Sequence, residues 1–191
     1  MKAIWAGGIT LAAWILAGIF IVTLSGGLAL LNVSRPNWQE YRSQAGRYSV
    51  LMPGKPKEQT QSVNSAVGTL DMHIASYEDR SGAYLIMYTD YPADLVNLDR
   101  ADAMLDGGAR GAVENVNGNL IQQQDFPLGN IPGREIEFNA PAQGAQPATR
   151  VKVRYFLVNN RMYQVMVVAQ QSQGLPVDTQ KYLDSFKLID N

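Results

Sequence analysis

The chain has 191 residues, with 16 lysines and arginines against 17 aspartates and glutamates, so its formal net charge is −1. Its scattered positive charges argue against nucleic-acid binding, which relies on a clustered basic face. The absence of cysteine excludes thiolate nucleophiles, disulfides, iron–sulfur clusters and cysteine-ligated zinc.

An apolar segment opens the chain. Residues 4–31 carry no charge and are mostly apolar, and this run exceeds the ~20 residues needed to cross a bilayer core. It is also longer than the apolar core of a cleaved signal peptide. We therefore expect residues 1–36 to form a membrane anchor and residues 37–191 to form a soluble domain. Cleavage after Leu31, which would leave a secreted domain, is the alternative. Positive charges on the two flanks are nearly balanced, so charge does not orient the anchor.

The first strand of the soluble domain is predicted in the stretch GRYSVLMP. Tyr48, Val50 and Met52 share one face of it, and the turn Pro53-Gly54-Lys55-Pro56 ends it. The polar segment KEQTQSVNSA follows and is predicted to be a loop, because it has little apolar content. A second strand is predicted in VGTLDMHIASYED, where alternate residues are apolar.

A third strand and the main helix come next. The stretch AYLIMYTDY, residues 83–91, is apolar on both alternating faces and predicts a strand that is covered on both sides. Residues 97–118 carry small and apolar side chains at helical spacing, with Asn97 or Asp99 as the N-cap and Gly118 as the stop signal. The small contact stripe of this helix favours close packing on a sheet.

The second half of the chain predicts four further strands and a short helix. The strands are Asn119–Phe126, Arg134–Asn139 and residues 149–158 and 161–169, and the helix occupies residues 178–189. Asn159-Asn160, between the last two strands, predicts a tight hairpin. Asp178 is the expected N-cap of the helix.

Two of these strands carry alternating charges. If they form a hairpin, pairing Glu135 with Lys152 and Glu137 with Arg150 keeps the apolar residues of both strands on one face. Arg154 is expected on the same outer face. We interpret these charges as a solvated cross-strand ladder rather than a binding site.

This order of elements predicts the α+β class. Strand regions that are apolar on both faces indicate one largely antiparallel sheet of about seven strands with helices on both faces, an α/β/α sandwich.

Several stretches together resemble a known group of domains. GRYSVLMPGKP, YLIMYTDYP, LDGGARGAVENVNG, LGNIPGREIEF, RMYQVMVV and YLDSFKL are similar to uncharacterised bacterial exported or membrane-anchored domains. In architecture the chain resembles the PsbP-like α/β/α sandwich of extrinsic photosystem II subunits. The resemblance covers nearly the whole soluble part and implies an extracytoplasmic location. It carries no functional residue over, because its motifs are structural.

The sequence offers few candidates for chemistry. His73 is the single histidine, and Asp71 and Asp90 are the carboxylates that a metal site or a hydrolytic site would combine with it. No established ligand spacing joins them. We interpret His73 as a surface residue, and the carboxylates near strand ends, including Asp79 and Asp94, as turn and cap residues. No catalytic, cofactor-binding or metal-binding residue is therefore predicted.

Aromatic residues in the strands are the remaining candidates. They could line a ligand groove, but tyrosines in strands are more typical of a core. The residues concerned are Tyr77, Tyr84, Tyr88, Tyr91, Tyr155 and Tyr163.

The sequence favours a non-enzymatic accessory or binding domain, held at a membrane by residues 4–31 and interacting with a protein or membrane complex on the extracytoplasmic side. The alternative is a hydrolase with a carboxylate-based site that the sequence does not reveal.

Overall fold

The computed structural model describes residues 36–65, 68–96 and 101–189. Residues 4–31, which we predict to cross the bilayer, lie outside these segments. Within the described segments, no helix is long and apolar enough to span a membrane. The elements, in chain order, are β1 (Gln39–Ser43), β2 (Tyr48–Met52), β3 (Lys57–Ser65), β4 (Gly68–Asp79), β5 (Gly82–Asp90), the 3-10 turn η1 (Ala93–Leu95), α1 (Ala101–Glu114), β6 (Asn119–Asp125), β7 (Gly133–Ala140), β8 (Thr149–Val158), β9 (Arg161–Gln170), α2 (Thr179–Asp184) and β10 (Lys187–Leu188).

The main sheet has seven antiparallel strands in the order β3-β4-β5-β9-β8-β7-β6, which confirms the predicted α+β class and sheet size. Two predictions about its membership are wrong. The segment KEQTQSVNSA, predicted as a loop, provides the edge strand β3. In addition, β2 lies between β1 and β10 in a separate three-stranded sheet. β3 escaped prediction because all of its residues except Val63 are polar, so it lacks the apolar alternation of a half-buried strand.

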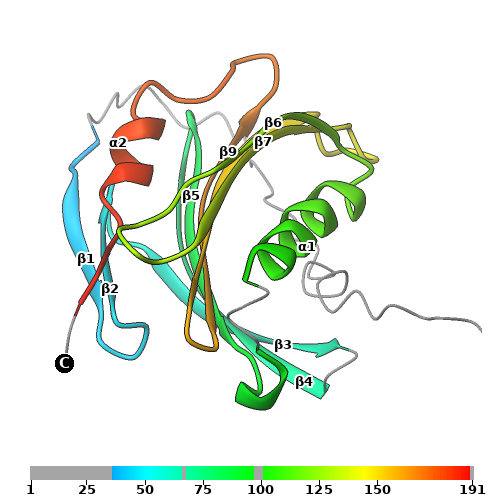
Figure 1. The fold of residues 1–191 in the computed structure, drawn as a ribbon. Helices are drawn as coiled ribbons and strands as arrows, with labels where there is room; N and C mark the ends of the chain where they lie inside the picture. The colour runs from blue at the N-terminus through cyan, green and yellow to red at the C-terminus, as the bar shows by residue number, and fades with distance from the viewer. Residues whose placement is uncertain (1–35, 66–67, 97–100, 190–191) are drawn as a thin grey trace, which may run out of the picture.

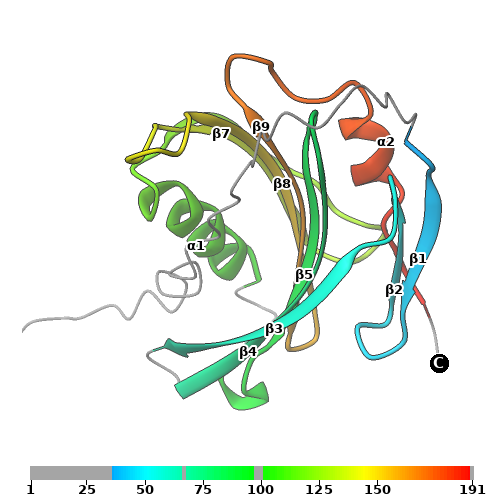
Figure 2. The ribbon, with the colours of Figure 1, turned by 180° about the vertical axis from the view of Figure 1, so that it is seen from behind.

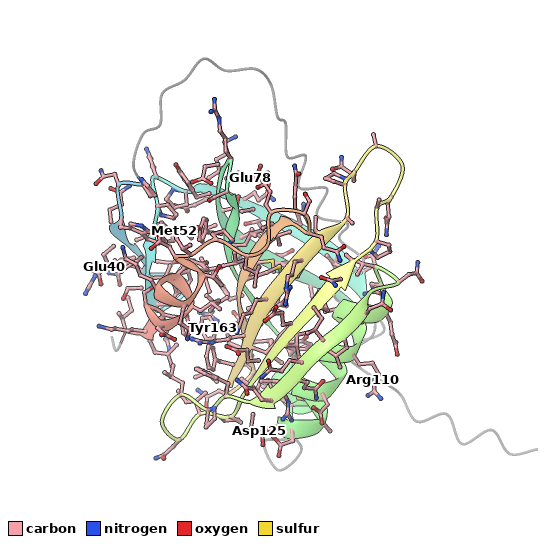
Figure 3. All side chains as sticks on the ribbon, turned by 90° about the horizontal axis from the view of Figure 1, so that it is seen from above. Glu40, Met52, Glu78, Arg110, Asp125 and Tyr163 are labelled. Atoms are coloured by element: carbon pink, nitrogen blue, oxygen red, sulfur yellow. The ribbon has the colours of Figure 1, made fainter. Side chains whose placement is uncertain are left out.

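Each face of the main sheet is covered by a different layer. α1 covers one face, called here the α1 face, and α2 with the small sheet covers the other, the α2 face (Figures 1 and 2). In Figure 3, Met52 and Tyr163 mark the α2 side, and Arg110 marks the α1 side. Two apolar cores result, because β5 and its neighbours send buried side chains to both faces. The prediction that residues 83–91 form a strand covered on both sides is confirmed.

The helix α1 packs closely on the sheet because its buried side is built largely from small residues. A Cβ atom added to Gly108 would lie 3.8 Å from the ring of Tyr155 on β8. The helix ends at Glu114, before the predicted stop at Gly118, and Asn117 takes the left-handed conformation with a φ of 50°. The N–H of Gly118 then donates to the carbonyl of Val113 at 2.8 Å. The predicted N-caps, Asn97 and Asp99, lie outside the described residues. The buried residues of α1 are Ala101, Leu105, Gly107, Ala109, Gly111 and Ala112.

The C-terminal helix is shorter than predicted. α2 ends at Asp184, and Lys187–Leu188 forms β10, which pairs with β2. Asp178 occupies the N-cap position, but its side chain makes no capping hydrogen bond. Instead, Ser185 ties this segment down, because its Oγ accepts a 2.9 Å hydrogen bond from the Leu51 N–H on β2.

The register between β7 and β8 differs by two residues from the predicted one. Glu135 lies opposite Arg154, and Glu137 lies opposite Lys152. The predicted pairs still form, but as diagonal contacts. Lys152 Nζ lies 3.1 Å from Glu135 Oε1, and Arg150 Nη2 lies 2.5 Å from Glu137 Oε1.

The predicted solvated ladder is also wrong in its burial, because Arg154 and Glu135 are only 1% and 4% exposed. Arg154 Nε donates to Glu135 Oε2 at 2.7 Å, and Nη1 donates to Asp184 Oδ1 at 2.7 Å. The guanidinium lies 3.7 Å from the centre of the Phe126 ring. Burial opposes ionisation of Glu135, but hydrogen bonds from Arg154 and Lys152 hold the pKa of Glu135 below its ordinary value. Asp184 at the end of α2 and Phe126 after β6 therefore cover Arg154, so that the Arg154–Glu135 pair is buried although it lies on the outer face of the hairpin.

Candidate functional site

The polar residues singled out from the sequence come together on the α2 face. Asp71 and His73 are two residues apart on β4, and Tyr88 and Asp90 are two residues apart on β5, so each pair shares a face. His73 lies directly opposite Tyr88, which places both pairs on the same face. The turn between β1 and β2 borders this region, because Arg161 Nη1 donates to the Ala45 carbonyl at 2.8 Å. We call the region the corner site; it comprises Thr60, Ser62, Asp71, His73, Tyr88, Asp90 and Arg161.

A row of stacked groups forms the centre of the corner site. The rings of His73 and Tyr88 are 4.5 Å apart and inclined by 17°, and Arg161 Cζ lies 4.4 Å from the centre of the Tyr88 ring. His73 on β4 and Arg161 on β9 flank Tyr88 on β5, because β5 lies between those strands in the sheet. Burial raises the pKa of Tyr88, and the positive charge of Arg161 opposes this effect in part. The tyrosine is therefore a neutral, fixed ring between an imidazole and a guanidinium.

Asp90 and Arg161 form the strongest polar contact of the corner site. Arg161 donates from Nε to Asp90 Oδ1 and from Nη2 to Asp90 Oδ2, both at 2.6 Å. This two-point geometry fixes both side chains more firmly than a single contact would. These hydrogen bonds raise the pKa of Arg161 further above its ordinary value. Both oxygens of Asp90 therefore face a permanent cation.

The other two candidates also have partners. Ser62 Oγ donates to Asp71 Oδ1 at 2.7 Å, and Thr60 Oγ1 lies 3.0 Å from His73 Nδ1 in a hydrogen bond. Both hydroxyl groups come from the edge strand β3. The corner site can therefore present fixed donors, acceptors and an aromatic stack to a partner. In this conformation both carboxylates are engaged by neighbouring side chains.

The arrangement brings the three sequence candidates onto one face but does not form a ligand set. Within the described ranges, no group of three or more His, Asp or Glu side chains is arranged to hold a metal ion. Asp79 is the last residue of β4, at the start of the turn into β5, where it accepts hydrogen bonds from the Ser81 N–H at 2.8 Å and from Ser81 Oγ at 2.6 Å. This contact confirms its interpretation as a turn residue. Asp94 lies in η1.

The strand tyrosines are mostly core residues, as predicted. Tyr84, Tyr88 and Tyr163 pack on the α2 face, with Tyr77 half-buried beside them. Tyr91 and Tyr155 are buried on the α1 face. A groove lined by all six is therefore excluded, since the sheet separates the two groups.

Sequence reasoning missed three members of the corner site. Thr60 and Ser62 were assigned to a loop, so no face could be given to them. Arg161 follows the Asn159-Asn160 turn, which is confirmed as a tight hairpin with Asn159 at a φ of 53°. Its contact with Asp90 requires β9 to lie beside β5, and these strands are separated by more than seventy residues. One signal in the sequence could have identified this pair: Asp90 lies at the end of one predicted strand, and the oppositely charged Arg161 is the first residue of another.

Comparisons with known proteins show the fold alone. No family model and no curated protein matches the chain. Among solved structures, it is similar to cyanobacterial PsbP (CyanoP) from Synechocystis sp. PCC 6803, with 13% identity and a TM-score of 0.52, over 84% of this chain and 97% of that chain. A protein of unknown function from Pseudomonas aeruginosa, PA94, matches at 9% identity and a TM-score of 0.34, over 71% and 85% of the two chains. The domain therefore has a PsbP-like fold.

Proposed function

We propose that this protein is a membrane-anchored, non-enzymatic accessory domain that binds a protein or a membrane complex on the extracytoplasmic side. The observation that carries the proposal is the corner site. Its polar groups are held by one another, which suits recognition by a fixed surface more than proton transfer by a free acid and base.

The membrane part of the proposal is supported by the sequence. Residues 4–31 are long and apolar enough to serve as the bilayer anchor, with the domain of residues 37–191 outside it. The extracytoplasmic location is supported by the resemblance of the soluble part to exported and membrane-anchored bacterial domains.

The structure also suggests how a partner would contact the corner site. His73 and Asp71 are at the solvent-facing side of the row, whereas Tyr88 is buried and the Arg161–Asp90 pair is fixed. A partner segment with hydroxyl or amide groups could hydrogen-bond to Asp71 and pack on the His73 ring. Little ordering of side chains would be needed on this side of the interface, which reduces the entropic cost of binding.

Affinity purification of the full chain from membranes in mild detergent tests the proposal. The wild type should retain a partner, and a variant with Asp71→Ala and His73→Ala should lose it, since the Arg161–Asp90 pair that stabilises the corner is left intact. Glu40→Ala, on the exposed strand β1 of the small sheet (Figure 3), is the matched control and should retain the partner. A wild type that always elutes alone, or a double variant that keeps its partner, would contradict the proposal.

The same purified proteins distinguish the proposal from the hydrolase alternative. Hydrolysis of broad ester, phosphoester or glycoside substrates by the wild type, with loss of activity in Asp71→Ala or Asp90→Ala, would favour the enzyme. Equal background rates in all proteins support the binding domain.

A further inference from the structure

The edge strand β3 offers an interaction surface that is separate from the side chains of the corner site. β3 is nine residues long and lies at the end of the main sheet. It pairs with β4 along its whole length, from Lys57 opposite Ser76 to Ser65 opposite Gly68, without a shift in register. In the part of the chain that the structure describes, β4 is its one strand partner. β3 and β4 reach outward together from the rest of the sheet (Figures 1 and 2).

β3 lacks most of the features that protect edge strands from pairing. Such strands usually carry a proline, a central charge or a bulge. The charges of β3, Lys57 and Glu58, stand together at its first end, and the following seven residues are uncharged and contain no proline or glycine. Among the described residues, no strand pairs with the outer backbone N–H and C=O groups of β3, which can therefore accept another strand of regular geometry.

The opposite edge of the sheet is different. β6 pairs with β7 through a register shift between Leu120 and Gln122, and such an irregularity twists an edge away from regular pairing. A head-to-tail contact between β3 of one copy and β6 of another would leave further edges open and build a filament. The irregular β6 edge disfavours this contact. Pairing between two β3 strands is related by a two-fold axis and therefore stops at a dimer.

We propose that a second copy of this chain pairs with β3 in an antiparallel, two-fold arrangement centred on Gln61. This register uses all nine residues of the strand, and it joins two seven-stranded sheets into one continuous sheet. Lys57 lies opposite Ser65, Glu58 opposite Asn64, Gln59 opposite Val63, and Thr60 opposite Ser62. No like charges face each other in this register.

The dimer has a consequence for the proposed function, although it does not depend on it. A two-fold axis perpendicular to the joined sheet places the α2 faces of both copies on the same side. Thr60 and Ser62 belong to the corner site of each copy, and in the dimer they also lie next to the interface between the two β3 strands. The two corner sites therefore form one bivalent surface, which strengthens binding to a partner with two contact segments.

Single-cysteine cross-linking of the full chain tests the register, since the natural sequence contains no cysteine. Gln61→Cys places two thiols opposite each other at the axis, within reach of a disulfide. Oxidation with copper–phenanthroline in dissolved oxygen should convert most of the detergent-solubilised chain to a covalent dimer. Glu58→Cys alone should not cross-link, because the two copies of residue 58 are six residues apart along the strands, or about 20 Å. A mixture of Glu58→Cys and Asn64→Cys chains should cross-link. Gln122→Cys on β6 is the control for random collision or association through the N-terminal segment.

Sedimentation of the uncross-linked chain provides the second measurement. Gln61→Lys places like charges opposite each other at the axis and should weaken the dimer roughly fivefold. The proposal is overturned if folded Gln61→Cys chains do not cross-link, if Gln122→Cys chains cross-link as efficiently, or if Gln61→Lys leaves the dimer unchanged.

Discussion

Replacing Glu135 by glutamine should destabilise the domain strongly, although the two side chains have nearly the same shape. The carboxylate accepts 2.7 Å and 3.1 Å contacts from Arg154 and Lys152, and it is 4% exposed. The amide removes the negative charge and turns one acceptor into a donor that faces these cations. Arg154, which is 1% exposed, then keeps Asp184 as its remaining carboxylate partner within the described residues.

The expected loss follows from this geometry. Removing one partner of a buried ion pair typically costs about 3–5 kcal/mol, because the other charge stays buried without compensation. Asp184 still neutralises Arg154, and the Asp184 side chain is 53% exposed to solvent. We therefore expect a loss at or just below the lower limit of that range, about 2–3 kcal/mol. For a domain of this size the melting temperature should fall by roughly 4–12 °C.

Urea unfolding of wild type and Glu135→Gln at several pH values measures the effect. The folded pKa of Glu135 is lowered below its ordinary value of 4.5, so its stabilising contribution is present above that pH and is lost as the pH falls through the folded pKa. The difference between the two proteins should therefore shrink in acid. Arg42→Gln is the control, since it breaks the exposed Arg42–Glu40 pair and should cost about 0.5 kcal/mol or less. A Glu135→Gln loss no larger than that of the control, or one that does not change with pH, would refute the reasoning.

Three further outcomes are expected. Thr89→Val should raise the free energy of unfolding by about 1 kcal/mol in urea, because the buried Thr89 Oγ1 has no hydrogen-bond partner among the described residues; a lower value would show that the hydroxyl is satisfied. Gly133→Ala should lower the melting temperature and cost about 2–3 kcal/mol, because its Cβ would lie 2.3 Å from the Phe126 carbonyl oxygen; a fully stable variant would contradict this close approach. Burial raises the pKa of Tyr182 well above its ordinary value of 10.0, so the stability that its neutral form provides is present below that pH and is lost as the pH rises through the folded pKa. Its phenolate absorbance should appear together with the loss of near-ultraviolet circular dichroism, and ionisation before unfolding would argue against its burial.

The predictions from sequence succeeded where burial leaves a periodic pattern. The strand at residues 83–91 and the small-residue helix α1 both carry such a pattern, because each contacts the core. β3 and β10 were missed for different reasons. β3 is too polar to show alternation of apolar and polar residues. β10 is only two residues long and belongs to a sheet formed by distant segments.

The corner site was predictable in part. Asp71, His73 and Asp90 were candidates because of their residue types, and alternation assigned Asp71 and His73 to the polar side of their strand. The order of strands in the sheet, which alternation does not encode, brings Arg161 next to Asp90. The burial of Arg154 escaped prediction for a similar reason, since Phe126 and Asp184 cover it from outside its own hairpin.

The contact between β2 and the last described segment affects how the chain is made. The Leu51 N–H reaches Ser185 over a separation of 134 residues, and β10 completes the sheet that begins with β1. During synthesis, the aromatic side chains that pack around Tyr48 remain exposed until Tyr182 and Phe186 have been made, because these two residues complete the cluster. Closing so long a loop is slow compared with local folding. A growing chain would therefore expose an aromatic surface until residues 182–188 have been synthesised, and chaperones that bind unfolded chains would be most useful to it in that interval.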